Sequence, residues 1–408
     1  MKTQILTVFL LLASVASAQT AANYPVVSTA QKYCYNNNGA TITCPASGSK
    51  FYGEDAQNQK NLPSYKDNGD GTISDLVTGL MWQQDPGDKI SLADALSGAS
   101  TFNLGGYSDW RVPTVKEMYS LINFNGKQGS SAETSVPYID TDYFVLKYGS
   151  GGSQVGDRLI DCQALTQTVY VSTTMKNDKT LFGVNFADGR IKGYPIENKR
   201  TKEHNSFYCY YVRDNPSYGK NDLVDNGDGT VTDKATGLMW MQVDSGHLKA
   251  GDNEDGKLSW EAALAWADGL SYAGHSDWRL PHAKELQSLV DYTRSPDTTN
   301  SAAIDPVFES TQITDEGGNV DWPWYWASTT HLEGAGRGGK LGVYVCFGRA
   351  LGYMKLPSDS DYTLYDVHGA GAQRSDFKTG DPADYPQGHG PQGDVVRIYN
   401  FARLVRDA

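Results

Sequence analysis

Asp67-Asn-Gly-Asp-Gly-Thr-Ile-Ser-Asp-Leu-Val-Thr-Gly-Leu-Met-Trp82 occurs a second time in the chain, as Asp225-Asn-Gly-Asp-Gly-Thr-Val-Thr-Asp-Lys-Ala-Thr-Gly-Leu-Met-Trp240. The two stretches align without a gap, and a match of this length indicates a duplicated structural unit. In both, Asn-Gly-Asp-Gly predicts a tight turn, because these residues tolerate positive φ, and the flanking apolar residues predict a hairpin. We expect Trp82 and Trp240 to anchor the two hairpins in a core.

A pair of helices is predicted after each hairpin. Ser91 and Ser259 are suitable N-caps for the first helices, and apolar residues follow them at helical spacing. The second helices follow Tyr107-Ser-Asp-Trp-Arg-Val-Pro113 and its copy, His275-Ser-Asp-Trp-Arg-Leu-Pro281. In the first unit, Thr114-Val-Lys-Glu117 predicts a capping box at the start of that helix.

Both units end in short β-type segments. The segments that we match, first unit against second, are 170–174 with 326–330, 183–190 with 342–349, and 211–214 with 404–407. The second unit is longer because it holds a Gly-, Pro- and Asp-rich loop from Leu356 to Asp394. Helices and strands of this kind predict the α+β class.

The length of 408 residues suits two domains of ordinary size, each with its own core. We expect a leading segment at 19–66, a first repeat at 67–214 and a second repeat at 222–408. The formal net charge of −13 disfavours nucleic acid as a partner, because an acidic surface repels phosphate backbones. It also disfavours heavily sulfated sugars across a broad face, although it leaves room for a local basic groove.

The N-terminus has the pattern of a secretory signal. Lys2 precedes an apolar run, and Ala16-Ser17-Ala18 fits a cleavage site before Gln19. The run is too short for a membrane span, and no later segment is long and apolar enough. We therefore expect export of residues from Gln19 onward, into the periplasm, onto the cell surface or into the medium.

The chain has five cysteines, and an exported protein favours disulfides. From proximity in sequence we expect one bridge between Cys34 and Cys44 and another between Cys162 and Cys209. Cys346 is then left over, as a buried free thiol in a strand or as a reactive thiol.

Taken together, these motifs resemble a bacterial domain family named after the C-terminal domain of the Legionella collagen-like protein. The resemblance is carried, in both units, by Asp-Asn-Gly-Asp-Gly-Thr, Thr-Gly-Leu-Met-Trp, Asp-Trp-Arg-x-Pro, Ser-Thr-Thr and the closing Val-Arg. It implies two tandem C-type-lectin-like domains, each with two helices, a small twisted antiparallel sheet and long loops. For the collagen-like namesake of the family it implies cell-surface adhesion through polyanionic glycans. The chain lacks the Glu-Pro-Asn and Trp-Asn-Asp triplets with which animal C-type lectins hold calcium and sugar.

The repeated turns invite a calcium site, because hard oxygens crowd there. The candidate carboxylates are Asp67, Asp70, Asp75, Asp225, Asp228 and Asp233. The alternative is that Asp and Asn shape the turn. Similarly, Asp109-Trp110-Arg111 and Asp277-Trp278-Arg279 either present an arginine to an anionic ligand or hold the fold together, and we expect the second.

The segment Trp322-Pro-Trp-Tyr-Trp326 predicts a stacking platform for sugar rings. Its three tryptophans share one face of an extended segment. The matching residues in the first unit are Thr166, Thr168 and Tyr170, so Trp322 and Trp324 are peculiar to the second unit. The alternative is that they fill a larger core.

The loop Asp366–Asp376 and His389 have no counterpart in the first unit. Long loops in compact domains are often functional, and Arg374 suits a carboxylate or sulfate. The predicted ligand-binding residues are Trp322, Trp324, Tyr325, Arg349, His368, Arg374 and Asp376. A metal held by His368, Asp376, Asp381 and His389 is the alternative role of this loop.

No nucleophile elbow, zinc-binding His-Glu-x-x-His or phosphate loop is present, so we do not expect an enzyme. The leading hypothesis is an exported protein that recognises a glycan or surface polymer. The alternatives are a structural or protein-interaction module of the cell envelope, and a metal or thiol enzyme on a fold like that of formylglycine-generating enzymes.

Overall fold

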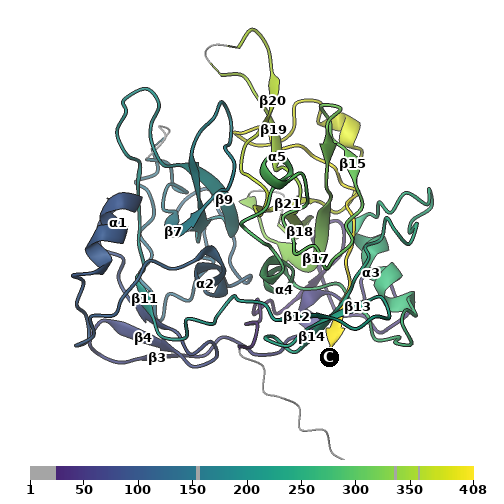
Figure 1. Ribbon diagram of the computed structural model, residues 1–408, viewed down its shortest axis with the longest axis horizontal. Coiled ribbons are helices and arrows are strands. Elements are labelled where there is room, and N and C mark those ends of the chain that lie inside the picture. The colour runs from purple at the N-terminus through teal and green to yellow at the C-terminus, as the bar shows by residue number, and fades with distance from the viewer. Residues whose placement is uncertain (1–23, 153–156, 335–337, 357–358) are drawn as a thin grey trace, which may run out of the picture.

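The computed structural model describes residues 24–152, 157–334, 338–356 and 359–408 (Figure 1). The predicted signal segment and the cleavage site before Gln19 lie outside these ranges. No helix in the described ranges is both long enough and apolar enough to cross a membrane.

The first unit contains two helices and a set of short strands. In chain order they are β3 (Tyr65–Asp67), β4 (Thr72–Asp75), β5 (Met81–Gln83), β6 (Ile90–Ser91), α1 (Leu92–Ala99), α2 (Val115–Ser120), β7 (Ala164–Val169), β8 (Thr180–Asn185), β9 (Arg190–Pro195), β10 (Ser206–Phe207) and β11 (Val212–Arg213). Strands β11, β5, β4 and β3 form one antiparallel sheet, and β10 pairs with β6.

The second unit repeats this order with insertions. Its elements are β12 (Leu223–Asp225), β13 (Thr230–Asp233), β14 (Leu238–Met241), α3 (Trp260–Gly269), α4 (Ala283–Ser288), α5 (Pro296–Thr299), β15 (Ile313–Thr314), β16 (Val320–Asp321), β17 (Trp324–His331), β18 (Leu341–Cys346), β19 (Leu351–Met354), β20 (Thr363–Asp366), β21 (Gln373–Phe377), the short helix η2 (Pro382–Asp384) and β22 (Val405–Asp407). The inserted hairpin β19–β20 projects from the top of Figure 1.

The predicted local features of the two units are confirmed. Trp82 and Trp240 are fully buried on their hairpins. Ser91 and Ser259 cap α1 and α3, and Thr114 forms the predicted capping box of α2. The second unit has a capping box as well, in which the His282 side chain takes the place of the threonine.

The two units are joined by one continuous sheet. Its strand order is β17-β18-β21-β9-β8-β7, so the first unit's β9 pairs with the second unit's β21. A single hydrophobic cluster includes residues of both units, among them Phe182 and Val345. Each unit also has a buried cluster of its own, around Leu181 in the first and around Trp326 in the second. The expected separation of the two cores is therefore incomplete, because the cluster that contains Phe182 and Val345 crosses the junction, where each unit covers the sheet edge of the other.

Strand pairing also corrects how the units superpose. Ala164 pairs with Val184, and Tyr325 pairs with Val345. Ala164 and Tyr325 each also form a parallel bridge to a later segment. Tyr325 is therefore the structural counterpart of Ala164, and Trp326 that of Leu165. Our match of Trp326 with Tyr170 was wrong. It rested on the identical Ser-Thr-Thr that follows both residues, and this short identity does not reflect how the strands pair.

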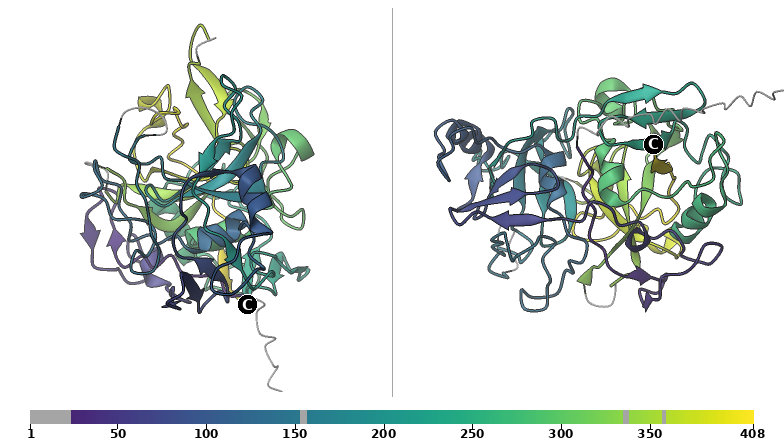
Figure 2. Two further views of the ribbon diagram at one scale, coloured as in Figure 1. Left: turned by 90° about the vertical axis from the view of Figure 1, so that its left-hand side faces the viewer. Right: turned by 90° about the horizontal axis from the view of Figure 1, so that it is seen from below.

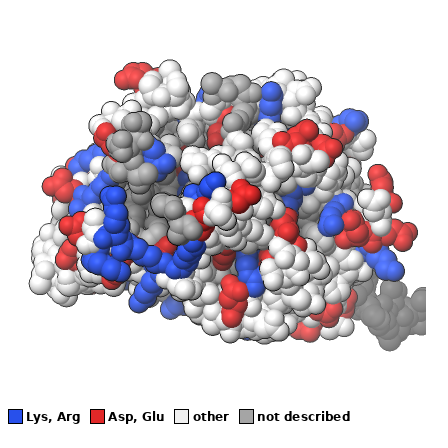
Figure 3. Space-filling model, turned by 90° about the horizontal axis from the view of Figure 1, so that it is seen from above, with Lys and Arg blue, Asp and Glu red and all other residues white. Residues whose placement is uncertain are grey.

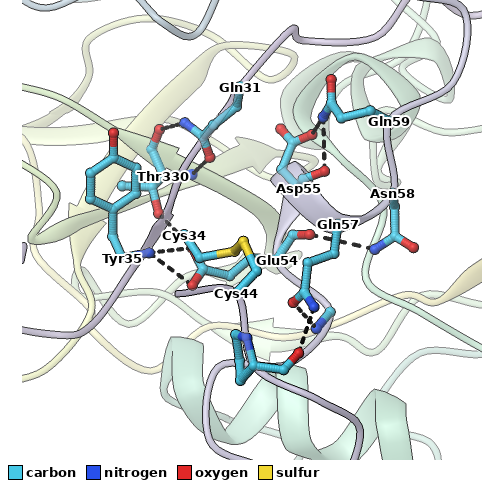
Figure 4. The surroundings of a disulfide bond; sticks show 12 residues. Gln31, Cys34, Tyr35, Cys44, Glu54, Asp55, Gln57, Asn58, Gln59 and Thr330 are labelled. Carbon is cyan, nitrogen blue, oxygen red and sulfur yellow. Dashed lines mark hydrogen bonds between the residues drawn. A yellow bond between two sulfur atoms is a disulfide. The ribbon is translucent and has the colours of Figure 1, made fainter. Parts of the chain in front are cut away.

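The leading segment packs on the second unit (Figure 4). Its short strands β1 (Cys34–Tyr35) and β2 (Thr41–Ile42) are tied by the predicted Cys34–Cys44 disulfide, which is confirmed. The amide of Gln31 donates to the carbonyl of Thr330 at 2.6 Å, and its oxygen accepts from the backbone N–H of the same residue at 2.9 Å. In the view from below, the purple leading segment lies beneath the second unit (Figure 2).

The second predicted disulfide is contradicted. Cys162 and Cys209 are both buried free thiols. Cys209 packs in a cluster with Leu165, whereas the thiol of Cys162 lies 3.7 Å from the Asn185 side-chain oxygen. The two thiols thus contact different surroundings, although their chain segments are neighbours. Cys346 is a buried free thiol at the end of β18, as one of the two interpretations predicts.

Candidate binding cleft

The Asp-Trp-Arg motifs have structural roles in both units. Arg111 forms a two-point ion pair with Glu117 of the capping box, at 2.6 and 2.8 Å. Arg279 does the same with Glu285, at 2.7 Å for both bonds. Burial by itself would raise the pKa of Glu285, but the Arg279 guanidinium outweighs it and the pKa is about 2. These arginines hold the two helices in place, as we expected.

The aspartates of the repeated turns accept hydrogen bonds from their own loops. Asp70 accepts from the backbone N–H and the hydroxyl of Thr72, and Asp228 does the same with Thr230. In the candidate metal loop, Asp381 accepts from the backbone of Ala383 and caps η2. Nowhere in the described ranges do three His, Cys, Asp or Glu side chains come together in a way that suits a metal ion.

The tryptophans of the predicted platform are buried. Trp322, Trp324 and Trp326 expose only 8%, 1% and 0% of their surface. The platform prediction was wrong because β17 lies between two cores. Trp322 and Tyr325 belong to the cluster that the units share, whereas Trp324 and Trp326 belong to a second cluster, where Trp324 stacks on Tyr344 at 4.7 Å.

Tyr325 and Arg349, which we predicted to contact ligand, have partners within the protein. The Tyr325 hydroxyl donates to a carboxylate oxygen of Asp244 at 2.6 Å. The Arg349 guanidinium donates to Asp297 at 2.6 Å and to the carbonyl of Val320 at 3.0 Å. Both side chains therefore stabilise the second unit through hydrogen bonds between its own segments.

His368, Arg374 and Asp376 are also buried. The Nε2 atom of His368 lies 3.2 Å from Asp394 Oδ1, and Arg374 forms an ion pair with the same carboxylate. The Asp376 carboxylate accepts two backbone N–H bonds at 2.7 and 2.8 Å, and burial raises its pKa to about 6. Arg374 and Asp376 line a cavity between the units, whereas no predicted site residue but Trp324 lines the cleft described next.

The second unit contains a cleft of about 740 Å³, lined in part by Ile313 and Thr314 of β15. Aromatic side chains line it: Trp324, Tyr353, Tyr385, Tyr399 and Phe401. Pro382 and Pro386 of the long loop form part of its wall. A cleft of this size and composition is typical of sites for small organic ligands or short polymer segments.

An ion pair lies across the base of the cleft. The Arg397 guanidinium stacks 3.8 Å from the Trp324 ring centre and forms a two-point ion pair with Glu316, at 2.8 and 2.9 Å. Lys257 and Asp255, on the rim, also form an ion pair, at 3.5 Å. The charges at the cleft are therefore balanced within the protein.

The most exposed aromatic residue of the cleft was missed in the sequence. Tyr399 exposes 45% of its surface, and the corresponding position of the first unit, from the register of β17 and its neighbour, is Ser206. The exchange of a serine for a tyrosine next to the closing strand was the available signal. We did not recognise this correspondence in the sequence, because the long loop of the second unit changes the offset between matching residues of the two units.

The fold and the cleft define a duplicated α+β protein whose second unit has a cleft lined by aromatic side chains. A family model described as the Lcl C-terminal domain matches residues 71–213 and 229–363, so the chain belongs to that family. The match confirms the resemblance that the motifs suggested. No characterised protein and no solved structure matched the chain.

Proposed function

We propose that this is an exported recognition protein that binds a glycan or surface polymer through the aromatic cleft of its second unit. We also propose that each unit has a C-type-lectin-like fold, in which long loops carry the binding surface. The observation that supports the function best is the lining of the cleft, to which Tyr353, Tyr385 and Tyr399 all contribute.

The chemistry of the cleft suits a sugar chain. Aromatic rings offer flat apolar faces to the apolar faces of sugar rings, and tyrosine hydroxyls add hydrogen bonds at the edges. Since Arg397 is already paired with Glu316, the cleft has no uncompensated charge with which to select a strongly ionic ligand. Residues of the long loop, among them Pro382 and Pro386, line the site together with Asp255 and Lys257.

A matched pair of tyrosine variants tests this proposal. Tyr399, in the cleft, and Tyr362, outside it, expose 45% and 47% of their surfaces. Residues 19–408 are applied to a glycan array, and the best ligand is then titrated by calorimetry. We expect Tyr399→Ala to weaken binding about tenfold or more, as loss of an aromatic anchor does.

Tyr362→Ala is the control and should bind as the unsubstituted protein does. Equal affinity of all three proteins for the ligand would place binding elsewhere and refute the role of the cleft. Absence of binding to every glycan, together with co-purification of an envelope protein, would favour the structural or protein-interaction alternative.

A further inference from the structure

A second cavity, of about 910 Å³, lies where the two units meet, and we refer to it as the seam cavity. Strands β9 and β21 contribute to it from the two sides of the junction, with Arg190 and Lys192 on β9 and Arg374 on β21. The cavity therefore exists only because the units are joined by one sheet.

Two arginines face each other across this junction. Gln373 pairs with Ile191, which places Arg374 opposite Arg190 on antiparallel strands. Arg374 exposes 8% of its surface and Arg190 exposes 6%. Burial and the charge of Arg190 both lower the pKa of Arg374. Two like charges held in this way need acceptors nearby.

The protein supplies only part of what these arginines can bind. Arg190 donates to the Ser375 hydroxyl at 2.9 Å and lies 3.1 Å from Glu333. Within the described part of the chain, however, Arg374 Nε and Nη1 and Arg190 Nε have no hydrogen-bond partner. One carboxylate oxygen in the cavity, Asp188 Oδ1, likewise has no donor there. The walls of the seam cavity thus contain donors and an acceptor without partners; these atoms are almost fully covered, so a ligand reaches them only when the side chains turn toward the cavity.

The charges of the seam cavity are nevertheless balanced. Its three buried basic residues each have an acidic partner: Arg190 with Glu333, Lys192 with Asp188, and Arg374 with Asp394. On the face shown in Figure 3, Lys and Arg gather on one side with acidic side chains among and beside them. An anionic ligand would leave an uncompensated negative charge in a cavity of a chain whose net charge is −13. A neutral ligand with hydroxyl groups avoids this cost, because a hydroxyl both donates and accepts.

The seam cavity and the aromatic cleft adjoin each other. Val395 and Val396 line both. The segment before these valines contributes to both cavities: residues of Pro382–Pro386 line the cleft, and residues of His389–Gln392 line the seam cavity. The cleft and the seam cavity therefore have these valines as a common wall, which places both within reach of one ligand longer than a single sugar ring.

We infer that the seam cavity is a second sugar subsite, and that the ligand is an uncharged oligosaccharide that spans it and the aromatic cleft. Hydroxyl groups of the sugar accept from Arg374 and Arg190 and donate to Asp188. This inference rests on the proposed glycan-binding function and adds to it the charge and the minimum length of the ligand.

The test measures binding of oligosaccharides of two lengths by calorimetry. The probes are the di- and hexasaccharides of the maltose, cellulose and β-mannan series, with heparin and polygalacturonate as polyanions. We expect a neutral hexasaccharide to bind, and Arg374→Gln to weaken it about tenfold. The matching disaccharide, which fits in the cleft, should lose affinity in Tyr399→Ala and not in Arg374→Gln.

Ser206→Trp provides an independent variant, because Ser206 lines the seam cavity and is exposed, so that its replacement leaves the buried charges intact. Like Arg374→Gln, it should weaken binding of the hexasaccharide and leave binding of the disaccharide unchanged. Thermal unfolding identifies any variant that fails to fold. If Tyr399→Ala weakens the hexasaccharide but neither seam variant does, the second subsite is refuted and the proposed function stands. Tighter binding of a polyanion that depends on Arg374 refutes a neutral ligand. Binding of none of these probes refutes both proposals.

Discussion

A single glycine in β18 makes room for Trp260, one of the buried tryptophans of the second unit. A Cβ atom at Gly342 would lie 2.6 Å from Cδ1 of Trp260, far inside van der Waals contact. In the first unit, the structurally corresponding residues are Leu181 and Leu92, and both belong to one cluster. The first unit thus fills this part of its core with two leucines, whereas the second unit fills the same space with a glycine and a tryptophan.

This exchange predicts strong coupling between the two positions. Gly342→Leu alone should lower the free energy of unfolding by about 3 kcal/mol, because the added side chain overlaps the indole. Trp260→Leu alone should cost about 3 kcal/mol through the cavity it leaves. The double variant restores the first unit's pair, so urea unfolding should show a double-mutant coupling energy of at least about 1 kcal/mol. Purely additive losses would contradict this account of the core.

Helices α2 and α4 are linked at the junction of the units by two reciprocal hydrogen bonds, each from a lysine of one helix to the end of the other. The ammonium of Lys116, on α2, donates to the carbonyl of Ser288 at the end of α4, at 2.6 Å. Lys284, on α4, donates to the carbonyl of Ser120 at the end of α2, at 2.7 Å. Each helix thereby receives a donor at its C-terminus, where carbonyl groups lack partners within the helix.

The burial of Lys284 in this arrangement makes the stability of the protein depend on pH. Burial lowers the pKa of Lys284 to about 7, while in the unfolded chain it is near its ordinary 10.5. Between these values the unfolded chain binds the extra proton, so the free energy of unfolding rises with pH. From pH 7 to pH 9.5 the contribution of Lys284 is about 3 kcal/mol.

The measurement is urea unfolding at pH 7 and at pH 9.5 of the unsubstituted protein and of Lys284→Met. The difference in stability between the two proteins should grow in favour of the unsubstituted protein at the higher pH. Lys66→Met, at an exposed position of β3, is the control and should show the same pH dependence as the unsubstituted protein. A difference that is independent of pH would show that Lys284 has an ordinary pKa.

The two units contact each other along a shared sheet and a shared cluster of buried side chains. The six-stranded sheet crosses the junction, a single cluster contains side chains of both units, and the leading segment packs on the second unit. We therefore expect one calorimetric unfolding transition, with equal calorimetric and van't Hoff enthalpies. Residues 222–408 expressed alone should lack a cooperative transition, because removal of β9 exposes the edge of β21. Two separate transitions in the full chain would contradict the shared core.

Local features were predictable because they depend on neighbours in the chain. The Asn-Gly-Asp-Gly turns, the serine caps and the Thr114–Glu117 capping box each use residues within one or two turns of one another. The Cys34–Cys44 bridge belongs to the same class, since it closes a short hairpin. The family followed from these motifs and from their order.

What the sequence alone determined is therefore the duplication, the order of elements in each unit and the family. Only the tertiary structure decided where a ligand can bind. The alternation in Trp322–Trp326 predicted one buried and one exposed face, but β17 lies between two cores and both faces are covered. The cleft around Tyr399 and the seam cavity around Arg374 arise from segments far apart in the chain, and their contacts depend on how the two units share one sheet. A pattern of neighbouring residues carries no information about such a shared edge.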